Sequence, residues 1–230
     1  MRAKMARQNS ASRAAAPSRE RMLQAAKSLF AKEGYENAST SAIAREAGSS
    51  ESQLVKHFGG KPGLLEAVLD RGWLEIAGQV NQALAFAPTP VAKLGILSHT
   101  MITFLDRDPA LKQLLLLEGR RVRRLGAKVA ISSGFVNFVQ LIDGILTEMQ
   151  QCGVLRPEVR PQAVRSALVG MLEGMMRDRM LAKTMGFPAE FSADDVPLLL
   201  TLVINGLSAH PTEAPDSPRQ IRSANGSVQP

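Results

Sequence analysis

Residues 49–61, Ser-Ser-Glu-Ser-Gln-Leu-Val-Lys-His-Phe-Gly-Gly-Lys, decide the fold class of this chain. They predict a helix over 51–57 that Ser50 caps and that Gly59-Gly60 ends. So short a helix is not stable alone in water. Leu54 and Phe58 lie one helical turn apart and share a face, so we expect them to anchor the helix to its neighbours. The remaining, mostly polar surface is then free to meet a ligand.

A second short helix is predicted just before it, over 40–47, with Ser39 or Thr40 as its cap. Gly48 ends that helix in the left-handed conformation that glycine adopts most easily. Two short helices joined by a tight, glycine-containing turn form a helix-turn-helix unit. In that unit the second helix enters the major groove of DNA, and the first lies across the backbone.

The side chains of the second helix suggest how it would read DNA. Gln53 can bond an adenine edge through two hydrogen bonds, Ser52 can bond either base type, and Val55 can rest against a thymine methyl group. Glu51 has two open interpretations: its carboxylate can accept a hydrogen bond from cytosine, or its negative charge can simply stabilise the N-terminus of the helix. Phosphate contacts are expected from Lys56, His57, Thr40 and Lys61. The predicted DNA contacts are Thr40, Ser50, Glu51, Ser52, Gln53, Val55, Lys56, His57 and Lys61.

The composition excludes several other classes of protein. Aromatic residues make up 4% of the 230, and Leu, Ala and Met supply the apolar side chains, which favours helices over sheets. The single cysteine excludes an internal disulfide, and the three dispersed histidines form no metal-ligand cluster. We see no nucleophile–base–acid set, signal peptide or apolar run long enough to span a membrane. The sequence therefore predicts a cytoplasmic non-enzyme without metal, cofactor or membrane partner.

Positive charge is concentrated at the N-terminus. Residues 1–65 contain 11 Lys and Arg against 5 Asp and Glu, and so account for +6 of the net charge of +7. A localised basic region is typical of proteins that bind a polyanion, either nucleic acid or an acidic membrane surface. A simply solvated N-terminus explains the charge equally well.

Helical periodicity continues along the rest of the chain, with glycine and proline between the segments. Further helices are expected from 18 to Gly34, from 61 towards Phe86, and over 90–106, 109–126, 132–152, 161–184 and 193–208. We predict an all-α fold of about nine helices. It divides into a disordered basic arm (1–17), a three-helix helix-turn-helix domain (18–65), a larger helical domain (66–210) and a disordered tail (211–230).

Residues 18–68 strongly resemble the DNA-binding domain of TetR-family transcriptional regulators. The resemblance is carried by L-F-x-x-x-G-Y (29–35), I-A-x-x-A-G (43–48) and L-x-x-H-F-x-x-K-x-x-L-L (54–65). It implies a homodimer that binds a palindromic DNA operator, with a larger domain for an unidentified small-molecule effector and for dimerisation. It also implies that the basic arm is an extra DNA contact, although a solubilising tail fits as well.

The chain departs from this family at three positions of the helix-turn-helix. Val55 stands where the family usually has a tyrosine that touches DNA, Ser49 where valine is usual, and Ser52 where glycine is common. These departures affect the operator sequence, not the fold.

In the larger domain, the resemblance implies a pocket between the middle helices and a dimer interface on the last two. The expected effector pocket comprises Met101, Phe104, Leu105, Leu115, Glu118, Phe135, Phe138, Val139, Met171 and Met175. Its Met, Phe and Leu side chains suit a hydrophobic ligand, and Glu118 either orients a cationic ligand or points outward. The expected dimer interface comprises Leu168, Gly170, Leu172, Gly174, Leu199, Leu202 and Val203. For both sets, ordinary intrachain core is the competing interpretation.

The basic cluster Arg120–Arg124 fits a phosphate or acyl-CoA head group, and a solvated face fits it too. We expect a DNA-binding regulator, a repressor that a small hydrophobic or amphipathic effector releases from its operator. The alternative is a ligand-binding or interaction module whose DNA binding has weakened.

Overall fold

The computed structural model describes residues 2–121, 131–192 and 195–209, without the side chains of residues 2–17, 117 and 119–121. Within this part the chain forms helices and no named strand, apart from one isolated bridge between Leu155 and Ser208. The helices are α1 (Arg2–Glu33), α2 (Thr40–Glu46), α3 (Glu51–Phe58), α4 (Lys61–Leu84), α5 (Pro90–Arg107), α6 (Pro109–Arg121), α7 (Ser133–Gln151), α8 (Pro161–Met185) and α9 (Asp195–Leu207). The predicted all-α fold is confirmed.

The first helix differs from its prediction. We expected a start at Ser18 after a disordered arm, but α1 is continuous from Arg2. Residues 2–16 are rich in Ala, Arg, Met, Lys and Gln, which favour helix, and α1 continues through Pro17 although proline removes one backbone donor. Ser18 is therefore not an N-cap; its hydroxyl lies 3.3 Å from that of Ser49 in the helix-turn-helix. The predicted disordered tail, 211–230, lies outside the described residues.

The N-terminal domain is held together by a small apolar core. Met22, Phe30, Ile43 and Leu54 are fully buried, and they come from α1, α2 and α3. Burying an apolar side chain of this size contributes about 1.5–3 kcal/mol, which offsets the instability of two isolated short helices. The third helix is stable because of this packing and not because of its own sequence.

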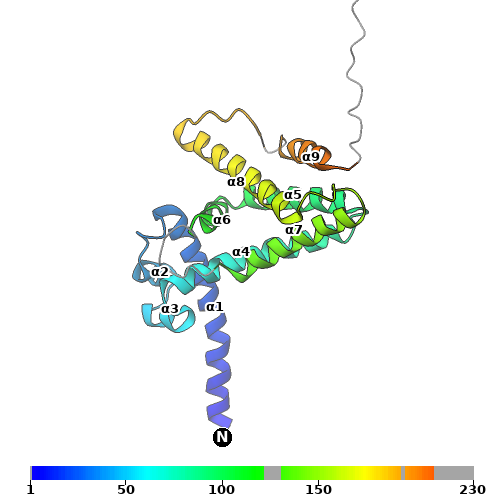
Figure 1. Ribbon diagram of the computed structural model, residues 1–230. Coiled ribbons are helices and arrows are strands. Elements are labelled where there is room, and N and C mark those ends of the chain that lie inside the picture. Colours follow the sequence, from blue (N-terminus) through cyan, green and yellow to red (C-terminus); the bar gives the residue numbers. More distant parts are fainter. Residues whose placement is uncertain (1, 122–130, 193–194, 210–230) are drawn as a thin grey trace, which may run out of the picture.

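Helix α4 connects this domain to the rest of the molecule. It starts beside α1 and α3 and runs into the larger domain, where it packs against α5 and α7 (Figure 1). Two glycines allow the close packing. A Cβ on Gly72 would come within 2.5 Å of the Leu111 side chain, and one on Gly134 within 2.3 Å of Trp73 Cβ.

Helices α5 to α9 complete the larger domain. Helix α6 packs against α1, α7 against α8, and α9 against α5 (Figure 1). The bridge at Leu155 and a hydrogen bond from Arg156 N–H to the Leu207 carbonyl hold the end of α9 to the α7–α8 loop. No helix in the described ranges combines the length and hydropathy that crossing a bilayer requires.

Ion pairs join the two domains beside α6. Lys27 Nζ on α1 lies 2.6 Å from Asp108 Oδ2 at the α5–α6 junction, and Asp108 Oδ1 accepts from Leu111 N–H at 2.9 Å. Burial by itself would raise the pKa of Asp108, but the hydrogen bonds and the charge of Lys27 outweigh it, so the pKa lies below its ordinary value of 3.8. Asp108 is therefore both a cap for α6 and an interdomain contact.

Candidate DNA-binding surface and effector pocket

Serine caps fix the two helices of the helix-turn-helix. Ser39 caps α2 by accepting from Ala42 N–H, and Ser50 caps α3 by accepting from Gln53 N–H. Gly48 takes φ = 61° in the turn, and Ser49 N–H bonds back to the Ala44 carbonyl at 2.9 Å. The predicted helix-turn-helix is confirmed, with the left-handed glycine where it was expected.

The inner face of α3 is held in place from several sides. Leu54 is fully buried and Phe58 packs against the same core. The Arg19 guanidinium lies 5.2 Å from the centre of the Phe58 ring, where a cation–π interaction is favourable. Gly63 permits the tight α3–α4 turn, because a Cβ there would lie 2.0 Å from the Phe58 carbonyl oxygen. Arg21 Nε donates to the Ala47 carbonyl at 2.9 Å and so braces the end of α2.

The outer face of α3 presents a continuous set of exposed side chains. We call this set the recognition surface; it consists of Ser50, Glu51, Ser52, Gln53, Val55 and Lys56. Val55 is 51% exposed, although it is aliphatic. None of these side chains is buried, so all six are accessible to a partner, although Ser50 also caps α3 and Glu51 also bonds Thr40. All six are among the DNA contacts predicted from the sequence.

Two hydrogen bonds within this region bear on the predicted contacts. Thr40 Oγ1 donates to Glu51 Oε1, which ties the start of α2 to the start of α3. The hydroxyls of Ser50 and Ser52 lie 3.0 Å apart. Glu51 therefore has a structural role between the helices in addition to its position at the helix N-terminus, where its negative charge is favourable.

Two predicted phosphate contacts are less accessible than the sequence indicated. Lys61 Nζ donates to the Glu36 carbonyl at 2.9 Å and lies 4.7 Å above the Tyr35 ring, so it fastens α4 to the α1–α2 loop. His57 Nε2 is buried and makes no hydrogen bond within the described part of the chain. In this conformation that nitrogen does not face a phosphate.

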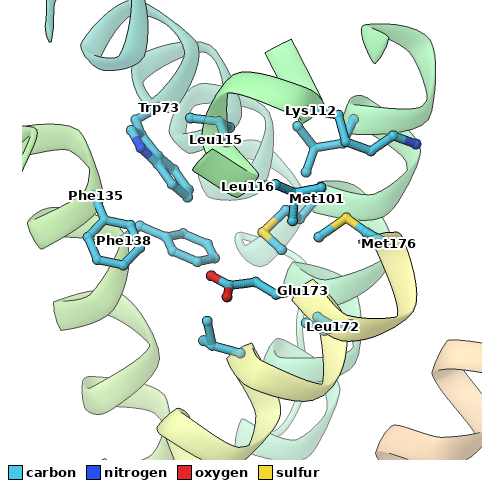
Figure 2. A pocket seen from close by; sticks show the side chains of 12 residues that line it. Trp73, Met101, Lys112, Leu115, Leu116, Phe135, Phe138, Leu172, Glu173 and Met176 are labelled. Atoms are coloured by element: carbon cyan, nitrogen blue, oxygen red, sulfur yellow. The ribbon is translucent and has the colours of Figure 1, made fainter. Parts of the chain in front are cut away.

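The larger domain contains an apolar pocket enclosed by five helices. It holds about 430 Å³ of empty space, part of it open to solvent, and Trp73 and Phe138 lie on one side of it (Figure 2). The lining residues are Trp73, Met101, Leu105, Lys112, Leu115, Leu116, Phe135, Phe138, Val169, Leu172, Glu173 and Met176. A mostly apolar cavity with few polar groups is typical of a small-molecule site.

The sequence predicted about half of this pocket. Met101, Leu105, Leu115, Phe135 and Phe138 line it as expected. The pocket lining does not include Phe104, Glu118, Val139, Met171 or Met175. The predicted set lacked Trp73 on α4 and the pocket-facing residues of α8. Val169, Leu172 and Met176 have helical spacing, but consecutive residues of a helix point about 100° apart, so an error of one position replaces Leu172 and Met176 by Met171 and Met175.

Glu118 was expected either to orient a ligand or to point outward, and neither interpretation is correct. It is 6% exposed and accepts two hydrogen bonds, from Trp73 Nε1 at 2.9 Å and from Ser132 N–H at 3.0 Å. These bonds join α6 to α4 and to the start of α7. The carboxylate is a structural link that fixes the Trp73 ring at the pocket wall.

Two charged residues line the pocket. Lys112 directs its Nζ to Asp106 at 2.6 Å, so mainly its methylene groups face the cavity. The carboxylate of Glu173 on α8 points into the space between Phe138 and Met101 (Figure 2). The basic cluster Arg120–Arg124 that the sequence singled out lies outside the described side chains.

The predicted dimer interface divides into inner and outer residues. Leu168 and Leu172 are buried in the chain's own core and so are unavailable to a second copy, because this face of α8 turns towards α7. Gly170 is exposed on α8, with nothing near a Cβ placed there, and Gly174 is half-buried. On α9, Val196, Leu200 and Ile204 are buried, whereas Leu202 is 57% and Leu199 37% exposed. Val203 is half-buried between these two stripes.

Comparison with known proteins identifies the N-terminal domain. Residues 22–68 match the family model of bacterial regulatory proteins, tetR family. The nucleoid occlusion factor SlmA of Vibrio campbellii is 27% identical over 111 residues, 46% of this chain and 57% of that protein. The chain therefore matches little more than half the length of that relative. The HTH-type transcriptional regulator UidR of Escherichia coli K12 is 25% identical over 172 residues, 71% of this chain and 82% of UidR.

The same architecture occurs in solved structures. The transcriptional regulator FadR from Bacillus subtilis, in complex with stearoyl-CoA, superimposes with a TM-score of 0.68 at 19% identity. The superposition covers 83% of this chain and 97% of FadR. At this identity the likeness supports the fold, and the ligand belongs to FadR alone. In the part of the chain that the structure describes, no group of three or more His, Cys, Asp or Glu is arranged to hold a metal ion.

Proposed function

The chain belongs to the TetR family of bacterial regulatory proteins through its N-terminal domain, and on this premise we propose that it is a ligand-responsive transcriptional repressor. The observation that carries the proposal is the recognition surface on α3. Its side chains are exposed although the helix beneath them is tightly fixed by Leu54 and Phe58. A rigid helix with a free polar face is what insertion into a major groove requires.

Within this surface the proposed roles follow from side-chain chemistry. Gln53 reads an adenine edge and Val55 contacts a thymine methyl group, while Lys56 pairs with a phosphate. Thr40, the first residue of α2, contacts the DNA backbone once DNA replaces its bond to Glu51. We leave the buried His57 nitrogen out of this set, and Lys61 joins it only after releasing the Glu36 carbonyl.

The effector would occupy the apolar pocket. Trp73 supports this link, because it lines the pocket and belongs to α4, the helix that begins directly after α3. A ligand that fits better when α4 has shifted would favour a conformation in which the recognition helices no longer match the DNA. The FadR complex with stearoyl-CoA supports a small molecule in this fold.

Dimerisation is the further requirement of the proposal. Two copies of α3 would have to lie about 34–36 Å apart to read successive major grooves of a palindromic operator. The exposed stripe of Leu198, Leu199 and Leu202 on α9, with Gly170 on α8, is the surface we propose for the partner. An apolar stripe of this kind is unfavourable in water and typical of a homodimer interface.

Binding to DNA upstream of the chain's own gene tests the proposal. Fluorescence anisotropy should give an affinity that falls steeply with salt, because phosphate contacts release counterions. Gln53→Ala should cost about 1–3 kcal/mol and relax specificity at one base pair, whereas Lys56→Ala should weaken all sequences alike and reduce the salt slope by about one. Lys183→Ala, an exposed lysine on α8, is the matched control and should bind as wild type does.

Val55 and Lys61 favour a second candidate function. An aliphatic residue stands where the family usually has tyrosine, and the lysine is held by the protein itself. A ligand-binding or interaction module with weakened DNA binding fits these two observations. Absence of salt-sensitive, sequence-preferring DNA binding by the wild-type protein would favour this function over the repressor.

A further inference from the structure

The polar side chains that line the effector pocket are engaged by other groups of the protein. The Trp73 indole N–H donates to the Glu118 carboxylate at 2.9 Å, and Glu118 is not part of the pocket lining. Lys112 directs its ammonium group to Asp106 at 2.6 Å. Glu173 also has an interaction partner within the chain. Each polar side chain of the described lining therefore has a protein partner before a ligand enters.

The rest of the lining is apolar, with a rigid side and an adaptable side. On the rigid side, the ring centre of Trp73 lies 4.8 Å from that of Phe138 and 5.4 Å from that of Phe135, and the bond to Glu118 fixes the indole. Across the cavity, Met101 and Met176 supply flexible thioether side chains that adapt to an apolar body (Figure 2). Such a cavity binds a ligand through the apolar surface that it removes from water.

A charged ligand loses more than it gains in these surroundings. A charged head group that enters an apolar cavity gives up its hydration, and only a counter-charge or a set of hydrogen bonds compensates for that loss. Lys112 could serve an anion only by leaving Asp106, which also lies 3.5 Å from Arg179. Glu173 would likewise have to leave its present partner to serve a cation. An uncharged ligand avoids these costs and keeps the full gain from apolar burial.

We propose that the effector is an uncharged molecule whose apolar body contacts Trp73, Phe138, Met101 and Met176, and whose polar atoms stay at the side of the pocket that is open to solvent. This inference rests on the proposed function for the existence of an effector site, and it adds the chemical class of the effector. It narrows the expected hydrophobic or amphipathic effector to the first of these two classes. An acyl-CoA, such as the stearoyl-CoA of the FadR complex, belongs to the class that this pocket disfavours.

A matched series of ligands tests the preference for an uncharged molecule. The chain has a single tryptophan, Trp73, so its intrinsic fluorescence reports on the pocket directly. Decanol and methyl decanoate are uncharged, whereas decanoate, decyltrimethylammonium and decanoyl-CoA carry a charge on a body of the same length; each is titrated below its critical micelle concentration. We expect both uncharged ligands to bind at least about tenfold more tightly than any charged one, because a buried charge finds no available partner. Octanol should bind roughly fifteenfold more weakly than decanol, since each buried methylene group contributes about fourfold.

Variants locate the binding site and test its two charged lining residues. Val169→Phe places a larger side chain in the pocket and should weaken decanol binding about tenfold or more. Gln162→Phe, the same replacement at an exposed position on α8, should bind decanol as wild type does. Lys112→Gln and Glu173→Gln should leave the affinities for decanoate and decyltrimethylammonium unchanged relative to decanol. A thermal melt shows that each variant is folded.

Several results would overturn the inference. They are tighter binding of any charged ligand than of decanol, affinities that depend on neither charge nor chain length, absence of any fluorescence response, loss of cation binding in Glu173→Gln, and wild-type decanol binding by Val169→Phe. Release of operator DNA is measured separately by fluorescence anisotropy. If no ligand that binds the pocket changes operator binding, the ligand-responsive repressor fails while the ligand preference of the pocket stands.

Discussion

Replacing Glu118 tests whether the buried carboxylate holds the pocket wall. Its two oxygens accept from Trp73 Nε1–H and from Ser132 N–H, and all three residues are less than 9% exposed. In Glu118→Gln the amide oxygen still accepts from one donor, but its NH₂ group faces the other donor. One buried N–H loses its partner, which costs about 2 kcal/mol. In Glu118→Ala both donors lose their partner, and the cost rises to about 3–5 kcal/mol.

Urea denaturation at fixed protein concentration, followed by Trp73 fluorescence, measures these free energies of unfolding. A loss of about 2 kcal/mol in Glu118→Gln corresponds to a melting temperature lower by roughly 4–8 °C for a domain of this size. Glu66→Gln, an exposed acid on α4, is the control and should unfold as wild type does. If Glu118→Gln has the wild-type midpoint, or is less stable than Glu118→Ala, the carboxylate does not hold Trp73 and Ser132 in the way described.

Three further substitutions test other parts of the structure. Leu54→Ala should lower the free energy of unfolding by about 2–5 kcal/mol and abolish DNA binding, although the Leu54 side chain is buried and does not itself meet DNA. Val55→Ala, at an exposed position, should leave stability unchanged. Thermal melts and anisotropy check both variants, and equal melting temperatures would contradict the packing argument. Gly134→Ala should destabilise the protein by about 1–3 kcal/mol, because the added methyl group would clash with Trp73. Gly144→Ala on the same helix has open space around it and should stabilise the protein by about 0.5–1 kcal/mol. If Gly134→Ala is the more stable of the two variants, the close approach of α4 and α7 is refuted. Asp108→Asn should lose about 1 kcal/mol at neutral pH. Because the folded state lowers the pKa of Asp108, this contribution is full above the unfolded pKa and is lost as pH falls through the folded one. The difference from wild type should therefore begin to shrink below about pH 4 and vanish only below the lower, folded pKa; a constant difference down to pH 2 would contradict the assignment.

The N-terminal domain was largely predictable from sequence. Ser39, Ser50 and Gly48 act through backbone groups within a few residues of themselves, and each takes the predicted role. Leu54 and Phe58 were assigned to the inner face from their spacing alone. The helix boundaries beyond 60 also agree within a few residues, apart from the predicted end of the 109–126 helix, which lies outside the described residues; proline, glycine and capping residues act locally.

Side chains with two plausible environments were not predictable in this way. Glu118 was expected to meet a ligand or solvent, and instead accepts from Trp73, 45 residues earlier in the chain. Lys61 was expected to face DNA and instead bonds a carbonyl in the α1–α2 loop. In each case the partner lies on another element, and its position depends on how that element packs.

The sequence by itself determined the helical class, the helix-turn-helix and the exposed face of α3, because periodicity, caps and turns depend on near neighbours along the chain. The tertiary structure alone decided the rotation of α8 about its axis, which places Glu173 in the pocket and Leu168 in the core. It also decided which leucines of α9 stay exposed. These outcomes depend on the packing of whole helices against one another, and an amphipathic pattern with apolar residues on several faces is compatible with more than one such packing.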